Sequence, residues 1–328
     1  MYPVVTHQIW SVNGFLSAYS ANPLWGNGVI DLAGSGPVHM CGGVAAFVAA
    51  LILGPRKGRF YDDDGKPLDE PRDLGPHSVA LQFLGTFCLW FGWYGFNPCS
   101  VLKVTAYPET TALVAVNTTL AAATGAISAM FLESFLYSRK TGLTTYDLGY
   151  TMNGCLTGLA AITAPCATIE PWAAVVIGIT AGCLYCFASK LLVRFKIDDA
   201  VDAIPVHMFG GAWGVLSAGL FSNPYRMEAF YGRSDYVGWF YEWSRGSANF
   251  NVMGLQMIAV LLIFTWTFCV MGIFFYVLKL ANLFRIDPLE EEVGMDISRH
   301  KGAAYDISPA DETCVEELVQ RRSSHGSS

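Results

Sequence analysis

Charged residues are scarce in this sequence. Asp, Glu, Lys and Arg together make up 14% of its 328 residues, whereas ordinary soluble domains contain roughly a quarter. Hydrophobic residues make up 53%, so a soluble fold of this length would have too few polar side chains to cover its surface. The scarcity of charge therefore argues against a soluble protein and favours one that lies in a lipid bilayer.

Several chemical motifs are absent as well. The sequence has no phosphate-binding GxxxxGK[ST] loop, no HExxH zinc motif and no basic patch of the kind that binds nucleic acid. ATP-driven transport and nucleic-acid binding therefore have no support, and we expect no cofactor and no resident metal. Most of the nine cysteines lie in apolar stretches, where Cys behaves as a small hydrophobe. The CxxC of Cys183 and Cys186 has no second pair, which favours packing over a redox or zinc role.

Long apolar stretches are what the sequence does contain. A helix needs about 20 residues to cross the hydrocarbon layer. Seven stretches are long enough, at approximately 36–54, 76–98, 111–137, 147–166, 170–192, 201–221 and 254–281. We predict an all-α polytopic membrane protein with about seven transmembrane helices. The transmembrane domain is expected over 1–284 and a polar, acidic regulatory tail over 285–328.

The basic residues predict how these helices are oriented. Of the twenty Lys and Arg residues, sixteen fall on one side of the predicted bundle. The other side holds Lys103, Arg226, Arg233 and Arg245. Because cytoplasmic loops carry an excess of Lys and Arg, we expect the C-terminus in the cytoplasm and residues 1–30 outside.

One seven-residue sequence motif occurs twice in the chain, with a single difference between the copies. Residues 37–43 read PVHMCGG and residues 205–211 read PVHMFGG, and both copies lie in apolar stretches. A single histidine there could be a neutral imidazole that merely ties two helices together, but ionisable groups at membrane depth are costly and often functional. The second copy lies five spans after the first, and an odd step reverses the direction of crossing, which predicts an inverted repeat. We therefore expect His39 and His207 to face each other within hydrogen-bonding distance.

An aspartate accompanies each copy. Asp31 stands eight residues before His39, and Asp199 stands eight residues before His207. Either aspartate could cap the N-terminus of its helix, and for Asp199 that interpretation is sufficient. Asp31 lies on the predicted outer side, where a buried carboxylate would attract a cation.

The predicted second span ends in an aromatic run, LWFGWYGFNPCS at residues 89–100. Aromatic rings form belts at membrane interfaces, and that accounts for part of the run. The alternative is a narrow aromatic gate, because ammonium-like cations bind aromatic faces with about 0.5–2 kcal/mol each.

Four segments together resemble one family. They are DLAGSGPVHMCGG, LWFGWYGFNPCS, LAAITAPCATIEPWAA and IDDAVDAIPVHMFGGAWG, and they are similar to signatures of the ammonium transporter, methylammonium permease and Rhesus superfamily, in particular its plant-type branch. The resemblance runs from residue 1 to about residue 305. It implies a homotrimer in the plasma membrane, in which each subunit has its own pore between two inverted five-helix halves and an eleventh helix lies outside.

The resemblance also assigns residues. For the pore they are His39, His207, Trp93 and Phe96; for an outer recruitment site they are Trp10, Ser100, Asp31 and Thr163. In the tail, GMDISRH resembles a plant-type segment in which a hydroxyl residue is phosphorylated, and here that residue is Ser298. The implied function is transport of ammonium or ammonia, and of methylammonium as a second substrate, rather than enzymatic catalysis. Ammonium is recruited and deprotonated outside, and ammonia then passes the twin histidines.

The chain departs from the family pattern. Its seven expected helices correspond to helices five to eleven of the family, so we expect a piece that lacks the first four. Cys99 stands where glycine is usual, and Pro37 lies just before the first histidine.

Two other functions stay open. One is an ammonium sensor or a non-conducting regulatory subunit that signals through the tail. The other is a metal-ion transporter or intramembrane metalloenzyme that uses His39, His207 and Asp31, although metal sites usually need three or more clustered ligands.

Overall fold

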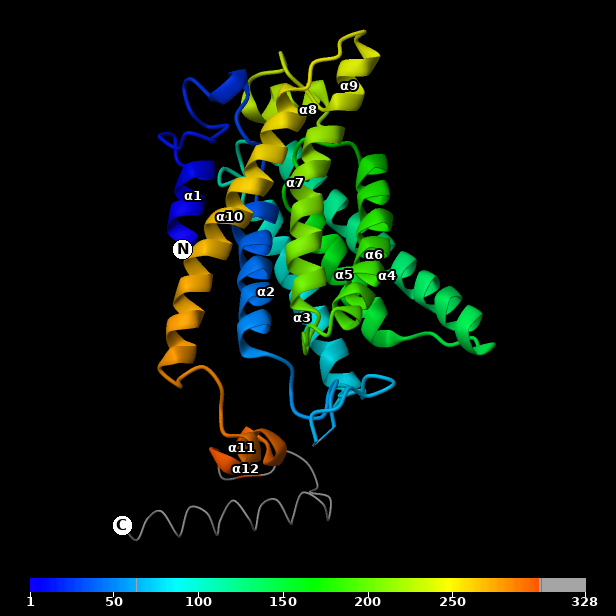
Figure 1. The fold of residues 1–328 in the computed structure, drawn as a ribbon. Coiled ribbons are helices and arrows are strands. Elements are labelled where there is room, and N and C mark those ends of the chain that lie inside the picture. Colours follow the sequence, from blue (N-terminus) through cyan, green and yellow to red (C-terminus); the bar gives the residue numbers. More distant parts are fainter. Residues whose placement is uncertain (63, 301, 303–328) are drawn as a thin grey trace.

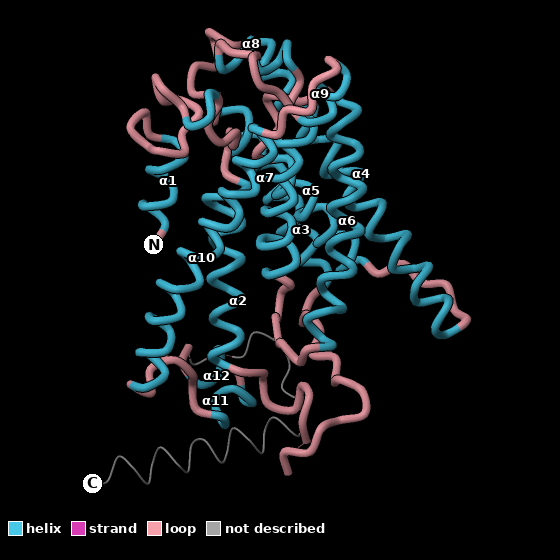
Figure 2. The backbone as a smooth tube through the Cα atoms, turned by 45° about the horizontal axis from the view of Figure 1, so that its top comes forward, coloured by secondary structure: helices cyan, strands magenta, loops and turns pink. Residues whose placement is uncertain are grey.

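The computed structural model describes residues 1–62, 64–300 and 302, and every regular element among them is helical (Figure 1). The elements are α1 (Tyr2–Trp10), η1 (Leu24–Gly26), η2 (Ser35–Met40), α2 (Cys41–Leu53), α3 (Val79–Cys99), α4 (Pro108–Thr141), α5 (Leu148–Ile162), α6 (Pro171–Arg194), η3 (Ile204–Phe209), α7 (Gly210–Phe221), α8 (Pro224–Tyr231), α9 (Trp239–Ser244), α10 (Asn251–Leu280), α11 (Pro288–Val293) and α12 (Met295–Ser298). Most loops lie at the two ends of the helix bundle, and the last part of α4 extends away from it (Figure 2).

Six helical segments in the described part of the chain are long and apolar enough to cross a membrane. They are η2 with α2, α3, α4, α6, η3 with α7, and α10. Some of their largest apolar side chains point away from the bundle, such as Phe91 of α3, which is 80% exposed, and Ile273 of α10, which is 70% exposed. Such surfaces are stable only in lipid or against other apolar helices, and the all-α, multi-pass membrane architecture is confirmed.

The seventh expected span, at 147–166, is the shorter helix α5, whose 15 residues place it outside those six. It ends at Ile162 because Pro165 follows the C-cap residue Thr163, and a proline cannot continue the backbone hydrogen bonding of a helix. Near its start, the Tyr150 ring contacts the Tyr185 ring, late in α6.

The opposite end of α5 lies at the other end of the bundle. The chain just after α5 is held by Asn117, early in α4, whose side-chain amide donates to the backbone oxygens of Cys166 and Ile169. Glu109 at the start of α4 and Glu170 before α6 both accept from Arg226. Helix α5 is therefore antiparallel to α4 and α6, and it traverses the bundle despite its length.

Small residues let these three helices pack closely. A side chain on Gly158 or on Gly178 would collide with the backbone of Ala121 in α4. Small residues at such positions are typical of membrane helices, whose backbones approach closely to gain packing and hydrogen bonds.

Helices α2 and α7 run through the bundle in opposite directions, as the repeated sequence motif predicted. Figure 1 shows α2 running toward α11 and α12, whereas α7 runs away from them. A Cβ on Gly211 would lie 2.6 Å from Met40 N, whereas a Cβ on Gly43 would collide with the backbone of Met208. Contacts that move backward from α7 into η3 while they advance from η2 into α2 are those of an antiparallel pair.

The first part of the tail lies against the loop that follows α2 (Figure 1). Arg285 donates to the backbone oxygens of Leu53 and Pro55 and forms an ion pair with Glu291 of α11. Glu291 also accepts from Lys57 N. Ser298 is buried at the end of α12. Residue 301 and residues 303–328 of the expected tail lie outside the described residues, and the boundary between 284 and 285 stays a prediction.

Candidate functional site

Each copy of the repeated motif begins in a widened, π-helical turn. These turns are η2, which leads into α2, and η3, which leads into α7. In η2, His39 N donates to Gly34 O, five residues back, at 3.0 Å. Pro37 stands two residues before His39 and Pro205 two residues before His207. Isolated π-turns are rare and often mark functional sites.

The two aspartates cap these turns. Asp31 Oδ1 accepts from Gly34 N at 2.6 Å and Ser35 N at 3.1 Å, and Oδ2 accepts from Gly36 N at 2.8 Å. Asp199 Oδ2 accepts from Ile204 N at 2.6 Å. In each copy, therefore, a carboxylate bonds the backbone N–H five residues ahead. Asp31 is buried and both of its oxygens are engaged, so it caps the N-terminus of η2.

The two histidines meet as expected. Nδ1 of His39 lies 3.2 Å from Nδ1 of His207, and the rings are nearly parallel, 6° apart, with centroids separated by 5.2 Å. The predicted hydrogen-bonding contact is confirmed. The remaining nitrogen of His39, Nε2, is buried and has no hydrogen-bonding partner among the described residues. Buried polar atoms are rarely left unsatisfied, so this atom is available to a molecule that the chain itself does not supply.

Two aromatic rings of α3 cover His39. The Trp93 ring stacks on the His39 ring at 5.2 Å and 11°, and the Phe96 centroid lies 5.7 Å from the same imidazole. Phe96 is 37% exposed, whereas Trp93 is 7% exposed. All four residues assigned to the pore by the sequence therefore lie in one cluster, contributed by η2, α3 and η3.

The four residues assigned to a recruitment site fall into separate groups, each with its own hydrogen bonds. Trp10 Nε1 donates to the backbone oxygen of Asp31 at 2.8 Å. Ser100 Oγ donates to Phe96 O at 2.6 Å. Thr163 is fully buried, and its hydroxyl contacts Trp93. Trp10 and Asp31 thus adjoin each other, while Ser100 and Thr163 bond to residues of α3.

Two further buried polar residues position the site, and neither was assigned a role from the sequence. Ser35 Oγ donates to Ala160 O and accepts from Ala164 N, both at 2.7 Å, and so ties η2 to the end of α5. Gln256 pairs its amide with both the N–H and the C=O of Ile30, next to Asp31. An amide in the apolar helix α10 was a signal that could have revealed Gln256.

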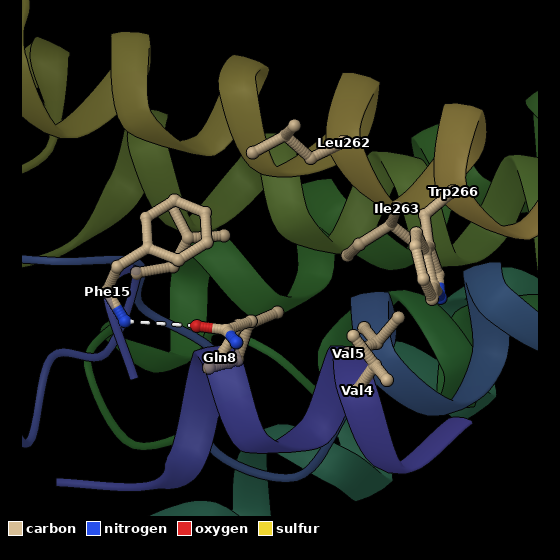
Figure 3. Close-up of a pocket in the computed structure, with 9 residues that line it drawn as sticks. Val4, Val5, Gln8, Phe15, Leu262, Ile263 and Trp266 are labelled. Carbon is tan, nitrogen blue, oxygen red and sulfur yellow. Dashed lines mark hydrogen bonds between the residues drawn. The ribbon is translucent and has the colours of Figure 1, made fainter. Parts of the chain in front are cut away.

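A metal site has no support in the described part of the chain, where no three His, Cys, Asp or Glu side chains cluster closely enough to hold an ion. A separate groove lies between α1 and α10, lined by Val4, Val5, Gln8, Ile9, Phe15, Leu16, Leu262, Ile263 and Trp266 (Figure 3). Its lining is apolar apart from Gln8, whose Oε1 accepts from Phe15 N, so it offers no reactive chemistry.

Comparison with known proteins identifies related chains. The sequence profile of the Ammonium Transporter Family matches residues 1–305. Ammonium transporter 1 member 1 of Solanum lycopersicum is 40% identical over 316 residues, which cover 93% of this chain and 62% of the relative. Ammonium transporter Amt2 of Archaeoglobus fulgidus is 40% identical over 309 residues, covering 93% and 61%. The chain thus spans about three fifths of the length of the curated relatives it matches.

Solved structures agree with this relationship. A structure titled "Sensor Amt Protein" superimposes with a TM-score of 0.72 at 33% identity, covering 91% of this chain and 66% of the other. The crystal structure of Candida albicans Mep2 superimposes with a TM-score of 0.69 at 29% identity, covering 87% and 56%.

Proposed function

Because the chain belongs to the Ammonium Transporter Family, we propose that its twin histidines line a transmembrane pathway for ammonium or ammonia, with methylammonium as a second substrate. The observation that carries this proposal is the His39–His207 pair, with the buried Nε2 of His39 left open to a small polar molecule. This is a site for transport, with no chemistry performed on the substrate beyond proton transfer.

The hydrogen bond between the histidines fixes what they offer. Two neutral imidazoles joined through their Nδ1 atoms must differ, because one donates an N–H and the other accepts it. The donor ring then carries a lone pair on Nε2, and the acceptor ring carries an N–H there. The pair therefore presents one acceptor and one donor to a molecule that passes.

Ammonia matches such a pair, since it has one lone pair and three N–H groups. Burying a bare ammonium ion costs far more than burying neutral ammonia, because an ion loses much more hydration energy. A pathway that removes one proton outside and passes ammonia along two neutral imidazoles lowers that barrier. The stacked Trp93 and the adjacent Phe96 exclude water from His39.

We place cation recruitment at Trp10, Asp31 and Ser100, whereas Thr163 is fully buried and bonded to Trp93. The charge of Asp31 and the aromatic face of Trp10, which its indole N–H links to the Asp31 backbone, suit an ammonium-like cation. We extend the proposal to a homotrimer in the plasma membrane with a cytoplasmic C-terminus. The excess of basic residues on the side of α11 and α12 supports that orientation.

A sensor is the second candidate. The superimposed structure titled "Sensor Amt Protein" favours it, and so does the contact of α11 with the loop that follows α2, through Glu291 and Lys57 N. In that function ammonium would occupy the same histidine pair and change the contacts of the tail rather than cross the membrane.

Uptake of labelled methylammonium separates the candidates. The chain would be expressed in cells that lack their own ammonium transporters, beside His39→Ala, His207→Ala and, as a matched control, the exposed His7→Ala. The proposal predicts methylammonium uptake by the chain and by His7→Ala. In His39→Ala and His207→Ala it predicts an altered uptake rate per molecule of protein. Saturable binding without uptake would favour the sensor, and neither binding nor uptake would overturn both.

A further inference from the structure

The hydroxyl of Thr163 bonds to the indole of Trp93. Trp93 Nε1 lies 3.1 Å from Thr163 Oγ1, which in turn lies 2.7 Å from Leu159 O. An indole N–H can only donate, so Thr163 accepts it, and the hydroxyl proton goes to Leu159. Thr163 has no exposed surface, and with its proton committed to the backbone it has nothing to donate to a passing molecule.

This hydrogen bond holds the Trp93 ring, which lies at one end of a stack of three aromatic rings. The Trp93 plane lies 11° from that of His39, and the His39 plane lies 6° from that of His207. The three rings come from α3, η2 and η3, while Thr163 follows α5. A fourth segment thus determines where the indole lies against the histidine pair.

Helix α3 has few other anchors in the bundle. Its buried residues are Thr86, Trp93, Asn97 and Pro98. Of these, Trp93 bonds to Thr163 and Asn97 Nδ2 donates to Thr118 Oγ1 at 3.1 Å. Trp93 also packs against Ala122, Cys155 and Leu159, and Thr163 supplies the hydrogen bond that sets the direction of its indole N–H.

We infer that Thr163 is a positioning residue, which holds the Trp93 indole parallel to His39 and keeps the indole N–H away from the unpartnered Nε2 of His39. The inference rests on the proposed transport function and gives Thr163 a task other than binding the substrate. Without the Thr163 acceptor, the indole N–H would be buried and unpaired, which costs enough to favour rotation of the ring. The rotated indole would offer a donor beside His39 and compete with the substrate.

Three substitutions test this in the full chain reconstituted in liposomes. Thr163→Val keeps the shape and removes the acceptor, Thr163→Ser keeps the hydroxyl, and Trp93→Phe removes the donor. We expect Thr163→Val to lower methylammonium transport efficiency about tenfold, as loss of one buried hydrogen bond implies, and Thr163→Ser to restore it to within about threefold. In a Trp93→Phe background, Thr163→Val should have no further effect, because the two residues act as one unit.

A spectroscopic arm is independent of transport. The Trp93 signal is obtained as the difference in indole fluorescence anisotropy between protein with Trp93 and protein with Trp93→Phe. Thr163→Val should lower that anisotropy and Thr163→Ser should preserve it. If the chain transports nothing but the anisotropy changes as expected, the proposed function fails and the positioning inference stands. An unchanged anisotropy, or a full effect of Thr163→Val in the Trp93→Phe background, would overturn the inference in favour of direct contact with the substrate.

Discussion

Arg56 and Asp198 join the end of α2 to the segment that leads into η3. Arg56 donates from its backbone N and from Nε to Asp198 Oδ2, both at 2.8 Å, and from Nη2 to Oδ1 at 2.9 Å. The Asp198 side chain is 4% exposed and the Arg56 side chain 35% exposed. The pair therefore fixes the two inverted helices at the end opposite to Asp31, and it lies outside the membrane-spanning segments.

This ion pair predicts a loss of stability in acid. Burial raises the pKa of the Asp198 carboxyl, but the hydrogen bonds and charge of Arg56 more than offset burial, so the pKa lies below its ordinary value. Such a carboxylate stabilises the fold above its unfolded pKa of about 4 and ceases to do so as the pH falls through the folded value. We expect Asp198→Asn to cost about 1–2 kcal/mol at pH 7, since Arg56 is partly screened by solvent.

Thermal unfolding in detergent at neutral and acidic pH measures this. The Asp198→Asn variant should lose less stability on acidification than the parent protein. Asp64→Asn is the matched control, because the Asp64 side chain is 80% exposed. Equal pH profiles for the Asp198 variant and the parent would show that the pair does not contribute.

Alanine substitutions at two adjacent glycines of α2 are expected to have opposite effects on stability. A Cβ on Gly43 would collide with the backbone of His207 and Met208, whereas a Cβ on Gly42 would meet nothing within 4 Å. We expect Gly43→Ala to cost about 3 kcal/mol or more, since a backbone cannot move aside as a side chain can. Gly42→Ala should be neutral or stabilise the helix by up to about 1 kcal/mol. Thermal unfolding of the two variants side by side checks both, and equal midpoints would contradict the close crossing.

Replacing the side-chain amide of Gln256 is expected to lower the stability of the fold substantially. Its side chain bonds to Ile30 N, Ile30 O and Val215 O, and it is fully buried. Gln256→Leu would leave the buried N–H and C=O of Ile30 unpaired, and we expect a loss of about 3 kcal/mol. Met257→Leu, at a neighbouring residue that is 44% exposed, serves as the control. A melting temperature of Gln256→Leu equal to that of the control would show that water replaces the amide.

Ser298 predicts regulation by the tail. A phosphate adds about 1.5–2 negative charges, and Ser298 is 5% exposed at the end of α12. We expect Ser298→Asp to open α11–α12, to increase tryptic cleavage at Arg285 and Arg299, and to reduce transport while abundance is unchanged. Ser298→Ala should resemble the parent. Unchanged uptake by Ser298→Asp would remove the regulatory role from this residue.

The sequence predicted most clearly what the internal repeat encodes. Six shared positions out of seven and the parity of the crossings were enough to bring His39 and His207 together, because inverted copies must meet at their equivalent positions. The aromatic run at 89–100 could be placed near them only through the family resemblance. Its local pattern is equally typical of an interfacial belt.

Other features depend on tertiary contacts that no local pattern contains. The shortness of α5 is the exception, because it follows from Pro165, a local signal that averaging hydropathy over a long window hides. The π-turns depend on carboxylates that bond backbone N–H groups five residues ahead, and the sequence could not separate capping from cation binding for Asp31. The acceptor role of Thr163 depends on the direction of the Trp93 N–H, which is defined only once α3 packs on α5.

Flux through liposomes that contain the purified chain tests the central claim most directly. Rates of methylammonium and potassium entry would be compared for the parent chain, His39→Ala and His207→Ala, each normalised to the amount of reconstituted protein. The twin-histidine pathway predicts that the parent passes methylammonium and excludes potassium. Each variant should slow methylammonium or admit potassium. Identical rates and selectivity per molecule in all three proteins would contradict it and leave the histidine pair as a tie between helices.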